Sequence, residues 1–191
     1  MSTPEVAAFL FGVAAVWLTT RENPWCWPLG LVNVALSGIV FYEARLYADT
    51  GLQGIYFALC LYGWHAWLRG GEDKGALAVS RAPRRWLAGL GGVGVAAAIG
   101  LGLALRRYTD ASIPFWDSST TAFSLVAQAL QTRKWIENWP LWIAVDVVYV
   151  GMYLYKSLFL MAGLYLVFLA LAVLGHLEWT KSLAARERAA A

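Results

Sequence analysis

Long apolar runs alternate with short polar or charged segments along the whole chain. Each run is about 20 residues long, the length that a helix needs to cross the hydrocarbon core of a bilayer. The runs are continuous, whereas a membrane β-barrel would show short strands of alternating residues. The pattern predicts an all-α membrane protein with seven transmembrane helices and a tight turn around Asp49–Gly51. The expected helix bounds are 4–20, 28–48, 51–68, 86–106, 114–132, 139–156 and 158–179.

The sequence repeats itself with an offset of 112 residues and no gap, which we interpret as a duplication of three helices. A three-helix unit repeated directly would be inverted in the membrane, and the fourth helix restores the parity. The repeat therefore predicts a 3+1+3 fold with two parallel three-helix repeats, a plan in which transporters bind their substrate at the repeat interface. The matched residues include Thr20 and Thr132, Trp27-Pro28-Leu29 and Trp139-Pro140-Leu141, Gly63 and Gly175, and Trp67 and Trp179.

The repeat also predicts how the chain is divided. We expect a first three-helix repeat at 1–68, a cytoplasmic loop with the linking fourth helix at 69–113, a second repeat at 114–180 and a cytoplasmic tail at 181–191. The fourth helix has no polar side chain between Trp86 and Arg106, which suits a helix that crosses the membrane and packs. Small residues let helices approach closely in a membrane. The residues expected to do so here are Gly89, Gly92 and Gly100.

Basic residues are concentrated on one side of the predicted bundle. With 60% hydrophobic and only 14% charged residues, against about 25% charged in soluble domains, the composition excludes a soluble protein. The loops and tail on one side carry eleven lysine and arginine residues, and those on the other side carry four. Because cytoplasmic loops are the basic ones, we expect the N-terminus outside and the C-terminus inside. The same asymmetry accounts for the net charge of +3, and we predict no nucleic-acid partner.

The sixth helix carries a polar and aromatic stripe in an otherwise apolar segment. Trp142, Asp146, Tyr149, Tyr153 and Lys156 are spaced 4, 3, 4 and 3 residues apart, which places all five on one helix face. A carboxylate this deep in the membrane is costly unless it faces a partner or a wet cavity, so Asp146 is a candidate functional residue. The alternative is a structural Asp–Lys or Asp–Tyr bond between packed helices.

The fifth helix carries a similar stripe, made of hydrogen-bonding side chains. Asp117, Thr121, Ser124, Gln128 and Gln131 follow the same spacing and share one face. We interpret the face as the lining of a transport pathway. The alternative is that hydroxyl groups bond their own helix backbone, as serine and threonine often do, although this does not explain Gln128.

Amide and aromatic groups on the second and third helices complete the candidate lining. Gln53 and Tyr56 share a face of the third helix, Trp64 lies beside it, and Asn33 of the second helix lies about as deep as Asp146. Amides and carboxylates bind hydroxyl and amide protons, and aromatic rings stack on indoles, which also attract a cationic ring. The mixture suits a flat aromatic ring with a polar or sugar substituent.

Other features narrow the class of protein. No nucleophile elbow, phosphate loop or zinc motif is present, and we expect no enzyme activity. His65 and His176 are the only histidines, so we expect no metal and no cofactor. Four tryptophans at helix ends are equally compatible with a site and with a belt at the membrane interface, namely Trp27, Trp67, Trp139 and Trp179.

Several short motifs now identify a family by resemblance. They are Gly30–Asn33, Gln53, Tyr62–Trp67, Pro114–Ser118, Thr132–Lys134, Glu137–Trp139 and Gly175–Trp179. Their order and composition resemble the PnuC family of bacterial vitamin transporters, which is associated mainly with nicotinamide riboside. The resemblance covers about residues 5–185. It implies a 3+1+3 fold in the bacterial cytoplasmic membrane and a homotrimer as a possible assembly.

The resemblance also implies a function and a set of site residues. The function is facilitated diffusion by alternating access, with the imported riboside trapped by cytosolic phosphorylation for NAD biosynthesis. Thiamine, riboflavin or a deoxynucleoside remains open as the substrate, as does a structural or sensory role without transport. The positions that match family binding motifs are Asn33, Gln53, Trp116, Asn138, Trp139 and Trp142. The residues added from the helix faces are Tyr56, Trp64, Gln128, Asp146, Tyr149 and Tyr153.

Overall fold

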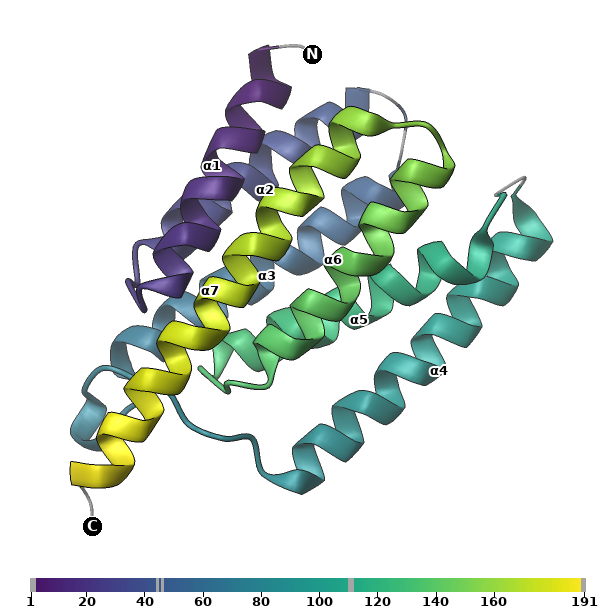
Figure 1. Cartoon of the computed structure of the whole chain (residues 1–191). Coiled ribbons are helices and arrows are strands. Elements are labelled where there is room, and N and C mark those ends of the chain that lie inside the picture. The colour runs from purple at the N-terminus through teal and green to yellow at the C-terminus, as the bar shows by residue number, and fades with distance from the viewer. Residues whose placement is uncertain (1–2, 44, 46, 110–111, 190–191) are drawn as a thin grey trace.

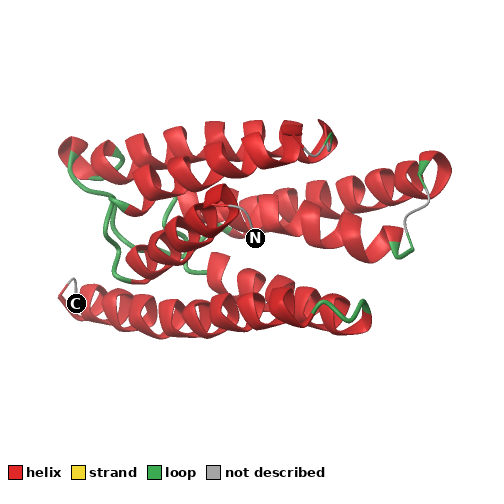
Figure 2. Cartoon of the chain, turned by 90° about the horizontal axis from the view of Figure 1, so that it is seen from above, coloured by secondary structure: helices red, strands yellow, loops and turns green. Residues whose placement is uncertain are grey.

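The computed structural model describes residues 3–43, 45, 47–109 and 112–189 (Figure 1). Within these ranges the chain forms seven α-helices and one 3-10 turn, and Figure 2 shows that short loops connect them. The all-α prediction is confirmed. The elements are α1 (Thr3–Thr20), α2 (Cys26–Glu43), α3 (Tyr47–Arg69), η1 (Glu72–Lys74), α4 (Arg84–Tyr108), α5 (Pro114–Thr132), α6 (Asn138–Tyr155) and α7 (Phe159–Ala189).

Two helix boundaries differ from the sequence prediction. The turn expected around Asp49–Gly51 is wrong, because both residues lie in α3, and the turn before it contains Arg45 with a left-handed φ of 60°. At the other end of the chain, α7 continues to Ala189 through most of the segment expected as a polar tail. Residues 181–189 contain mainly alanine, lysine, arginine, glutamate and leucine, which are good helix formers, so the polar composition does not end the helix.

Six of the helices form a ring, and the remaining helix, α4, lies outside it. Neighbouring helices pack in the order α1, α2, α3, α5, α6, α7 and back to α1. Two triplets, α1–α3 and α5–α7, therefore meet where α3 contacts α5 and where α7 contacts α1. α4 packs on α5 and extends along the edge of the bundle (Figure 1). This is the predicted 3+1+3 arrangement.

The duplication is visible in the turns of the two triplets. Glu22 and Lys134, which are 112 residues apart, both have left-handed φ values, of 54° and 50°. Arg45 and Ser157, separated by the same offset, have φ values of 60° and 56°. The backbone hydrogen bonds that close these turns also recur with this offset. Equivalent residues of the two repeats therefore adopt equivalent backbone conformations, including left-handed ones that residues other than glycine rarely adopt.

Four tryptophans form a core where the two triplets meet. The rings of Trp27 and Trp67 lie 5.3 Å apart in a T-shaped pair, and those of Trp139 and Trp179 make an equivalent pair at 5.3 Å. Trp67 and Trp179 join the pairs at 5.8 Å. All four side chains are at most 2% exposed. They are core residues and do not form an interfacial belt.

The same tryptophans tie one repeat to the other by hydrogen bonds. The indole N–H of Trp67 donates to the carbonyl of Gln131, and that of Trp179 donates to the carbonyl of Thr19, both at 3.0 Å. Donors and acceptors are again related by the repeat offset. The two ties hold the triplets together at the end of the bundle that contains the α1–α2 and α5–α6 turns.

The loop before α4 crosses this same end. The N–H of Ser80 donates to the carbonyl of Lys134 at 3.1 Å, and the Ser80 carbonyl accepts from the N–H of Ile136 at 3.0 Å. The N–H of Ala82 donates to the Glu137 carboxylate at 2.9 Å. The connection between the repeats is thus fixed to the α5–α6 turn before α4 begins.

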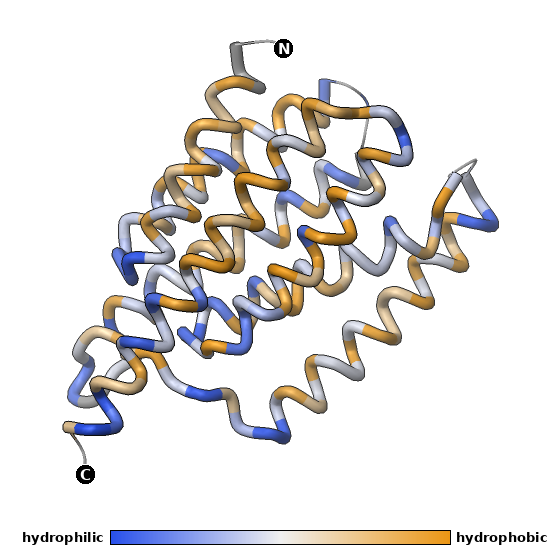
Figure 3. Tube along the Cα trace, in the orientation of Figure 1, coloured by the Kyte–Doolittle hydropathy of each residue, from blue (hydrophilic) through white to orange (hydrophobic). Residues whose placement is uncertain are grey.

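Hydrophobic residues follow one another along most helices, as a membrane protein requires (Figure 3). α2, α4 and α7 are long and apolar enough to cross a membrane by length and composition, and Val6–Thr20 is a shorter apolar segment. Large apolar side chains on these helices are exposed, among them Val93 at 64% and Leu160 at 69%. In the part of the chain that the structure describes, α3 and α5 carry polar side chains within their central turns and contact each other in the ring, and α6, next to α5, contributes the buried Asp146.

The glycines of α4 behave differently from the prediction. A Cβ on Gly89, Gly92 or Gly100 would have no atom within 4 Å, so these glycines face open space and do not permit a close helix contact. Gly94 and Gly102 make that contact instead, because a Cβ there would meet aromatic side chains of α5. The two faces of α4 are both apolar, and the sequence alone therefore did not separate the packed face from the exposed one.

Candidate functional site

Asp146 is buried in the interior of the second triplet. It lies in α6, is 4% exposed, and makes no ion pair with another described residue. Lys156, the cation on the same stripe, is exposed about three turns further along the helix. Lys156 therefore does not supply the Asp–Lys bond that was the structural alternative for Asp146. A buried carboxylate without a cationic partner in a membrane helix remains a candidate functional residue, and an Asp–Tyr contact with another helix remains the structural alternative.

A cluster of phenol rings adjoins Asp146. The ring of Tyr165 in α7 lies 4.4 Å from that of Tyr149 and 5.2 Å from that of Tyr153, measured between centroids. Tyr149 and Tyr153 stack on each other at 5.9 Å, and Phe168 closes the cluster edge-on to Tyr165 at 5.8 Å. Tyr165 also lies within electrostatic range of Asp146. The interior next to the carboxylate is therefore aromatic on two helices.

Tyr165 and Phe168 are missing from the sequence prediction. Tyr165 is the one residue with a polar group between Phe159 and Gly175, and that isolated phenol in an apolar helix was the available signal. The sequence did not show that α7 would place it against the stripe of α6. That contact depends on how the two helices pack.

The polar stripe of α5, which the sequence predicts to line a pathway, contacts α3 through Ser124 and Gln128 and α6 through Gln131. Ser124 also donates to its own helix at the Thr121 carbonyl, so the backbone-bonding alternative holds in part. Tyr149 lies beside Thr120 of this helix, which connects the stripe to the phenol cluster. The bridging contacts are Tyr56 Oη to Ser124 Oγ at 2.6 Å, Gln128 Nε2 to Cys60 Sγ at 3.8 Å, and Trp142 Nε1 to Gln131 Oε1 at 3.1 Å.

The remaining predicted residues lie in other surroundings. Asn33 donates to the Ala8 carbonyl at 2.6 Å, and Gln53 packs beside Gly38. Asn138 is fully buried and donates to the carbonyl of Trp135 at 2.7 Å, next to the tryptophan core that contains Trp139. The Asn33 and Gln53 contacts join neighbouring helices of the first triplet, and the Asn138 hydrogen bond is local to the α5–α6 turn.

Two predicted tryptophans are accessible on the surface. Trp64 is 37% exposed and Trp116 is 59% exposed. Trp116 is in the first turn of α5, at the end of the helix away from the tryptophan core. The predicted residues that lie around one interior are thus Tyr56, Gln128, Trp142, Asp146, Tyr149 and Tyr153.

This interior offers hydrogen bonding and aromatic contact, with one buried negative charge. No group of three or more His, Cys, Asp or Glu residues able to hold a metal ion occurs in the described ranges. Phenols, an indole and an amide next to a carboxylate can bind an aromatic or cationic ring that carries hydroxyl or amide groups.

An apolar exterior, two parallel triplets and a polar aromatic interior define a multi-pass membrane protein built to accommodate a small solute. Comparison with known proteins agrees. The family model described as nicotinamide mononucleotide transporter matches residues 2–181, and the chain belongs to this family. It is a member of a transporter family and not an enzyme, as the sequence predicted.

Individual relatives and a solved structure support this assignment. The nicotinamide riboside transporter PnuC of Escherichia coli strain K12 is 30% identical in an alignment 213 residues long, gaps included. The alignment covers 98% of this chain and 88% of the relative. The riboflavin/roseoflavin transporter RibM of Streptomyces davaonensis is 29% identical over 177 residues, covering 89% and 81%. A crystal structure of the vitamin B3 transporter PnuC matches with a TM-score of 0.72 at 23% identity, over 93% of this chain and 80% of that one. This structural match confirms the fold.

Proposed function

We propose that this protein carries nicotinamide riboside into the cell by facilitated diffusion, with alternating access and trapping of the riboside by phosphorylation. The observation that carries the proposal is the buried Asp146 carboxylate beside the Tyr149–Tyr153–Tyr165 cluster. Nicotinamide riboside joins a positively charged aromatic ring to a sugar, so it needs a negative charge, a ring contact and hydroxyl partners at one place. The PnuC relative from Escherichia coli supports this substrate.

Each group of the interior has a role in this proposal. Asp146 would balance the charge of the pyridinium ring, while Tyr149, Tyr153 and Trp142 would supply aromatic faces. Tyr56 and Gln128 would bind hydroxyl or amide groups. Trp116, with Trp64, Gln53 and Asn33, belongs to the wider predicted set and would act on the route to this interior. Asn138 and Trp139 lie at the closed end, where the substrate would leave.

The orientation of the protein in the membrane is inferred from the charges. The end that holds the tryptophan core also carries most of the basic loops, so we assign it to the cytoplasm of a bacterial inner membrane, with the N-terminus outside. In this proposal the tryptophan core and the two indole hydrogen bonds would form the cytoplasmic closure. Release would require the two triplets to separate there. Flux that follows an imposed pH gradient would contradict the uncoupled mechanism, since Asp146 would then carry a proton.

Riboflavin is the second candidate because a relative of similar identity is named a riboflavin/roseoflavin transporter. Riboflavin is an uncharged flat ring system with a polyhydroxylated chain, which fits phenols and amides without needing a carboxylate. Thiamine is cationic like nicotinamide riboside, so charge alone does not separate those two.

Calorimetric titration of the purified protein tests the proposal directly. Nicotinamide riboside, thiamine, riboflavin and a deoxynucleoside are titrated in parallel. Saturable binding of nicotinamide riboside in the micromolar range, with weak or no binding of the others, is the expected result. Preferred binding of another compound would identify that compound as the substrate. If none of the four compounds produces binding heat, a structural or sensory role would be supported.

A further inference from the structure

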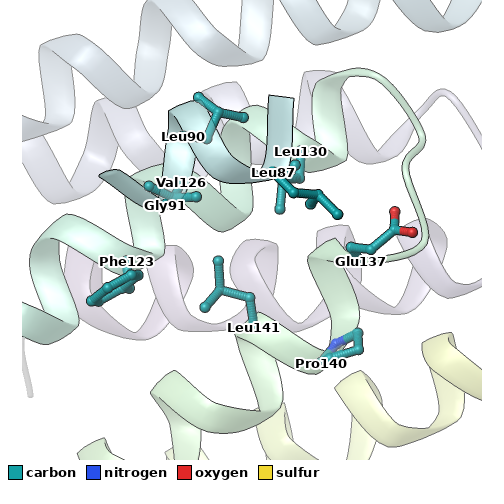
Figure 4. A pocket seen from close by; sticks show the side chains of 9 residues that line it. All are labelled: Leu87, Leu90, Gly91, Phe123, Val126, Leu130, Glu137, Pro140 and Leu141. Atoms are coloured by element: carbon teal, nitrogen blue, oxygen red, sulfur yellow. The ribbon is translucent and has the colours of Figure 1, made fainter. Parts of the chain in front are cut away.

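An apolar wedge lies on the outside of the ring, where residues of α4, α5 and α6 come together (Figure 4). Its volume is about 330 Å³, within the range of small-molecule pockets. Leu87 and Leu90 of α4, Leu130 of α5 and Leu141 of α6 line it, and Glu137 at one end is its single charged residue. The wedge does not contain any residue of the candidate transport site. It is therefore a separate feature of the fold.

The wedge lies on the surface that faces the membrane. The neighbouring part of α4 exposes Val93 at 64% and Val95 at 49%. Helix α4 is in addition one of the segments long and apolar enough to span the bilayer. A hydrocarbon chain is thus the material that surrounds the opening of the wedge, and its apolar walls match such a chain.

Positive charge lies at one end of the wedge. Arg84 precedes Leu87 by three residues, so it lies one helical turn before the wedge on the same face of α4, and Arg85 follows it. Both arginines are exposed, and neither forms an ion pair with another described residue. The nearby carboxylate of Glu137 already accepts the N–H of Ala82 at 2.9 Å. That hydrogen bond leaves the Glu137 charge in place, so this end of the wedge carries two arginines against one carboxylate.

An aromatic pair marks the same level of the membrane. Trp86, which is 50% exposed, lies 6.1 Å from the ring of Trp135. Exposed tryptophans prefer the headgroup region of a bilayer, where their rings are partly hydrated. The arginines of the first turn of α4 are thus at the depth of lipid phosphates, and the wedge begins where acyl chains begin.

We propose that the wedge binds an anionic phospholipid, with its phosphate on Arg84 and Arg85 and one acyl chain between α4 and the α5–α6 hairpin. A free phosphate would leave the apolar walls unused, and an uncharged hydrophobic molecule would leave the arginines unused. A lipid in this place would fill the space between the linking helix and the second repeat. The inference depends on membrane insertion and is independent of which substrate is carried.

Native mass spectrometry of the detergent-purified protein with phosphatidylglycerol and phosphatidylcholine tests the headgroup. Phosphatidylglycerol is expected to bind saturably and more tightly. The double variant Arg84→Ala/Arg85→Ala should weaken it about 30-fold, since each basic residue near a membrane surface contributes roughly a five-fold effect. The matched control is Arg106→Ala/Arg107→Ala at the other end of α4, where binding should be unchanged. Equal binding of both lipids, or an equal loss in the control, would overturn the proposal.

The position of the acyl chain has its own test. A Cβ on Gly91, which lines the wedge, or on Gly89, which does not, would meet no atom within 4 Å, so either position accepts a larger side chain. Gly91→Phe is expected to fill the wedge and reduce phosphatidylglycerol binding at least about tenfold, one power of ten in the dissociation constant. Gly89→Phe adds the same ring to the same helix and should bind like the parent. Unchanged binding by Gly91→Phe would exclude the wedge as the acyl site.

Discussion

Glu22 and Lys134 occupy equivalent positions in the two repeats and are bonded to each other. The Lys134 ammonium lies 3.2 Å from the Glu22 carboxylate and 4.5 Å from the centre of the Trp67 ring. The lysine side chain is 6% exposed and the glutamate side chain is 26% exposed. One duplicated position has thus become an acid in one repeat and a base in the other, and the pair joins the triplets beside the tryptophan core.

Reversal of the Lys134 charge should destabilise the protein. Lys134→Glu places two carboxylates together in a largely buried site, and we expect a loss of about 2 kcal/mol or more, given that breaking a buried pair costs several kcal/mol. The double variant Glu22→Lys/Lys134→Glu restores opposite charges and should recover much of the loss. Thermal unfolding in detergent measures both. A double variant no more stable than Lys134→Glu would show that the pair is not coupled.

The exposed pair of Lys181 and Glu178 serves as the comparison for this experiment. Their atoms are 2.9 Å apart, but the lysine side chain is 72% exposed. Because exposed pairs contribute about 0–1 kcal/mol, Lys181→Ala should barely change the unfolding temperature.

Substitution of Gly63 or Gly175 by alanine should disrupt the tryptophan core. An added Cβ would overlap the ring of Trp27 in the first case and that of Trp139 in the second. Overpacking of this kind costs about 1–3 kcal/mol. Gly163→Ala is the control, because its Cβ would meet no atom within 4 Å. Equal unfolding temperatures for all three variants would contradict the close ring contact.

Asp146→Asn should weaken the binding of a cationic substrate. Removal of the negative charge while the shape is kept should lower the affinity for nicotinamide riboside about 10- to 100-fold, since a charge contact in a protein is worth a few kcal/mol. Riboflavin, which is uncharged, should be little affected. Calorimetry on the parent and the variant measures the ratio, and an unchanged affinity for nicotinamide riboside would exclude a charge contact with Asp146.

Tyr165→Leu tests the part of the interior that α7 supplies. The leucine removes the ring that holds Tyr149 and Tyr153 in place, through contacts worth about 0.5–1.5 kcal/mol each. Because the proposed substrate stacks on those two rings, its binding should weaken about tenfold, one power of ten in the dissociation constant. Tyr155→Leu is the control, since Tyr155 is 77% exposed at the end of α6. If both variants bind like the parent, the phenol cluster has a structural role and the substrate lies elsewhere.

Periodicity in the sequence was sufficient to identify which faces matter on α5 and α6. Ser124, Gln128 and Gln131 do contact neighbouring helices, because a polar stripe in an apolar helix has one orientation that avoids lipid. Repetition was equally informative about topology, since it fixed the parity of the triplets without knowledge of any contact.

Residue type was less informative where the same kind of side chain can lie either in the buried core or in the candidate lining. Trp139 and Trp142 belong to the same motif, yet the first is part of the buried core and the second donates to Gln131 on the candidate lining. On α4 the choice between Gly92 and Gly94 depends on which side meets α5, and a helix that is apolar all round gives no hydropathy signal for this. These distinctions arise from packing, which the pattern along one chain does not contain.

The two indole ties are reciprocal, because each triplet donates from its last helix and accepts near the end of its first. A surface that complements itself in this way is typical of a twofold symmetric homodimer. Two copies of a single three-helix chain, related by a twofold axis, would form both hydrogen bonds. If two such copies are joined in one polypeptide and keep the same orientation in the membrane, one more transmembrane helix is required between them. α4 supplies it from outside the ring, so a single chain contains an interface with the pseudo-twofold symmetry of a homodimer.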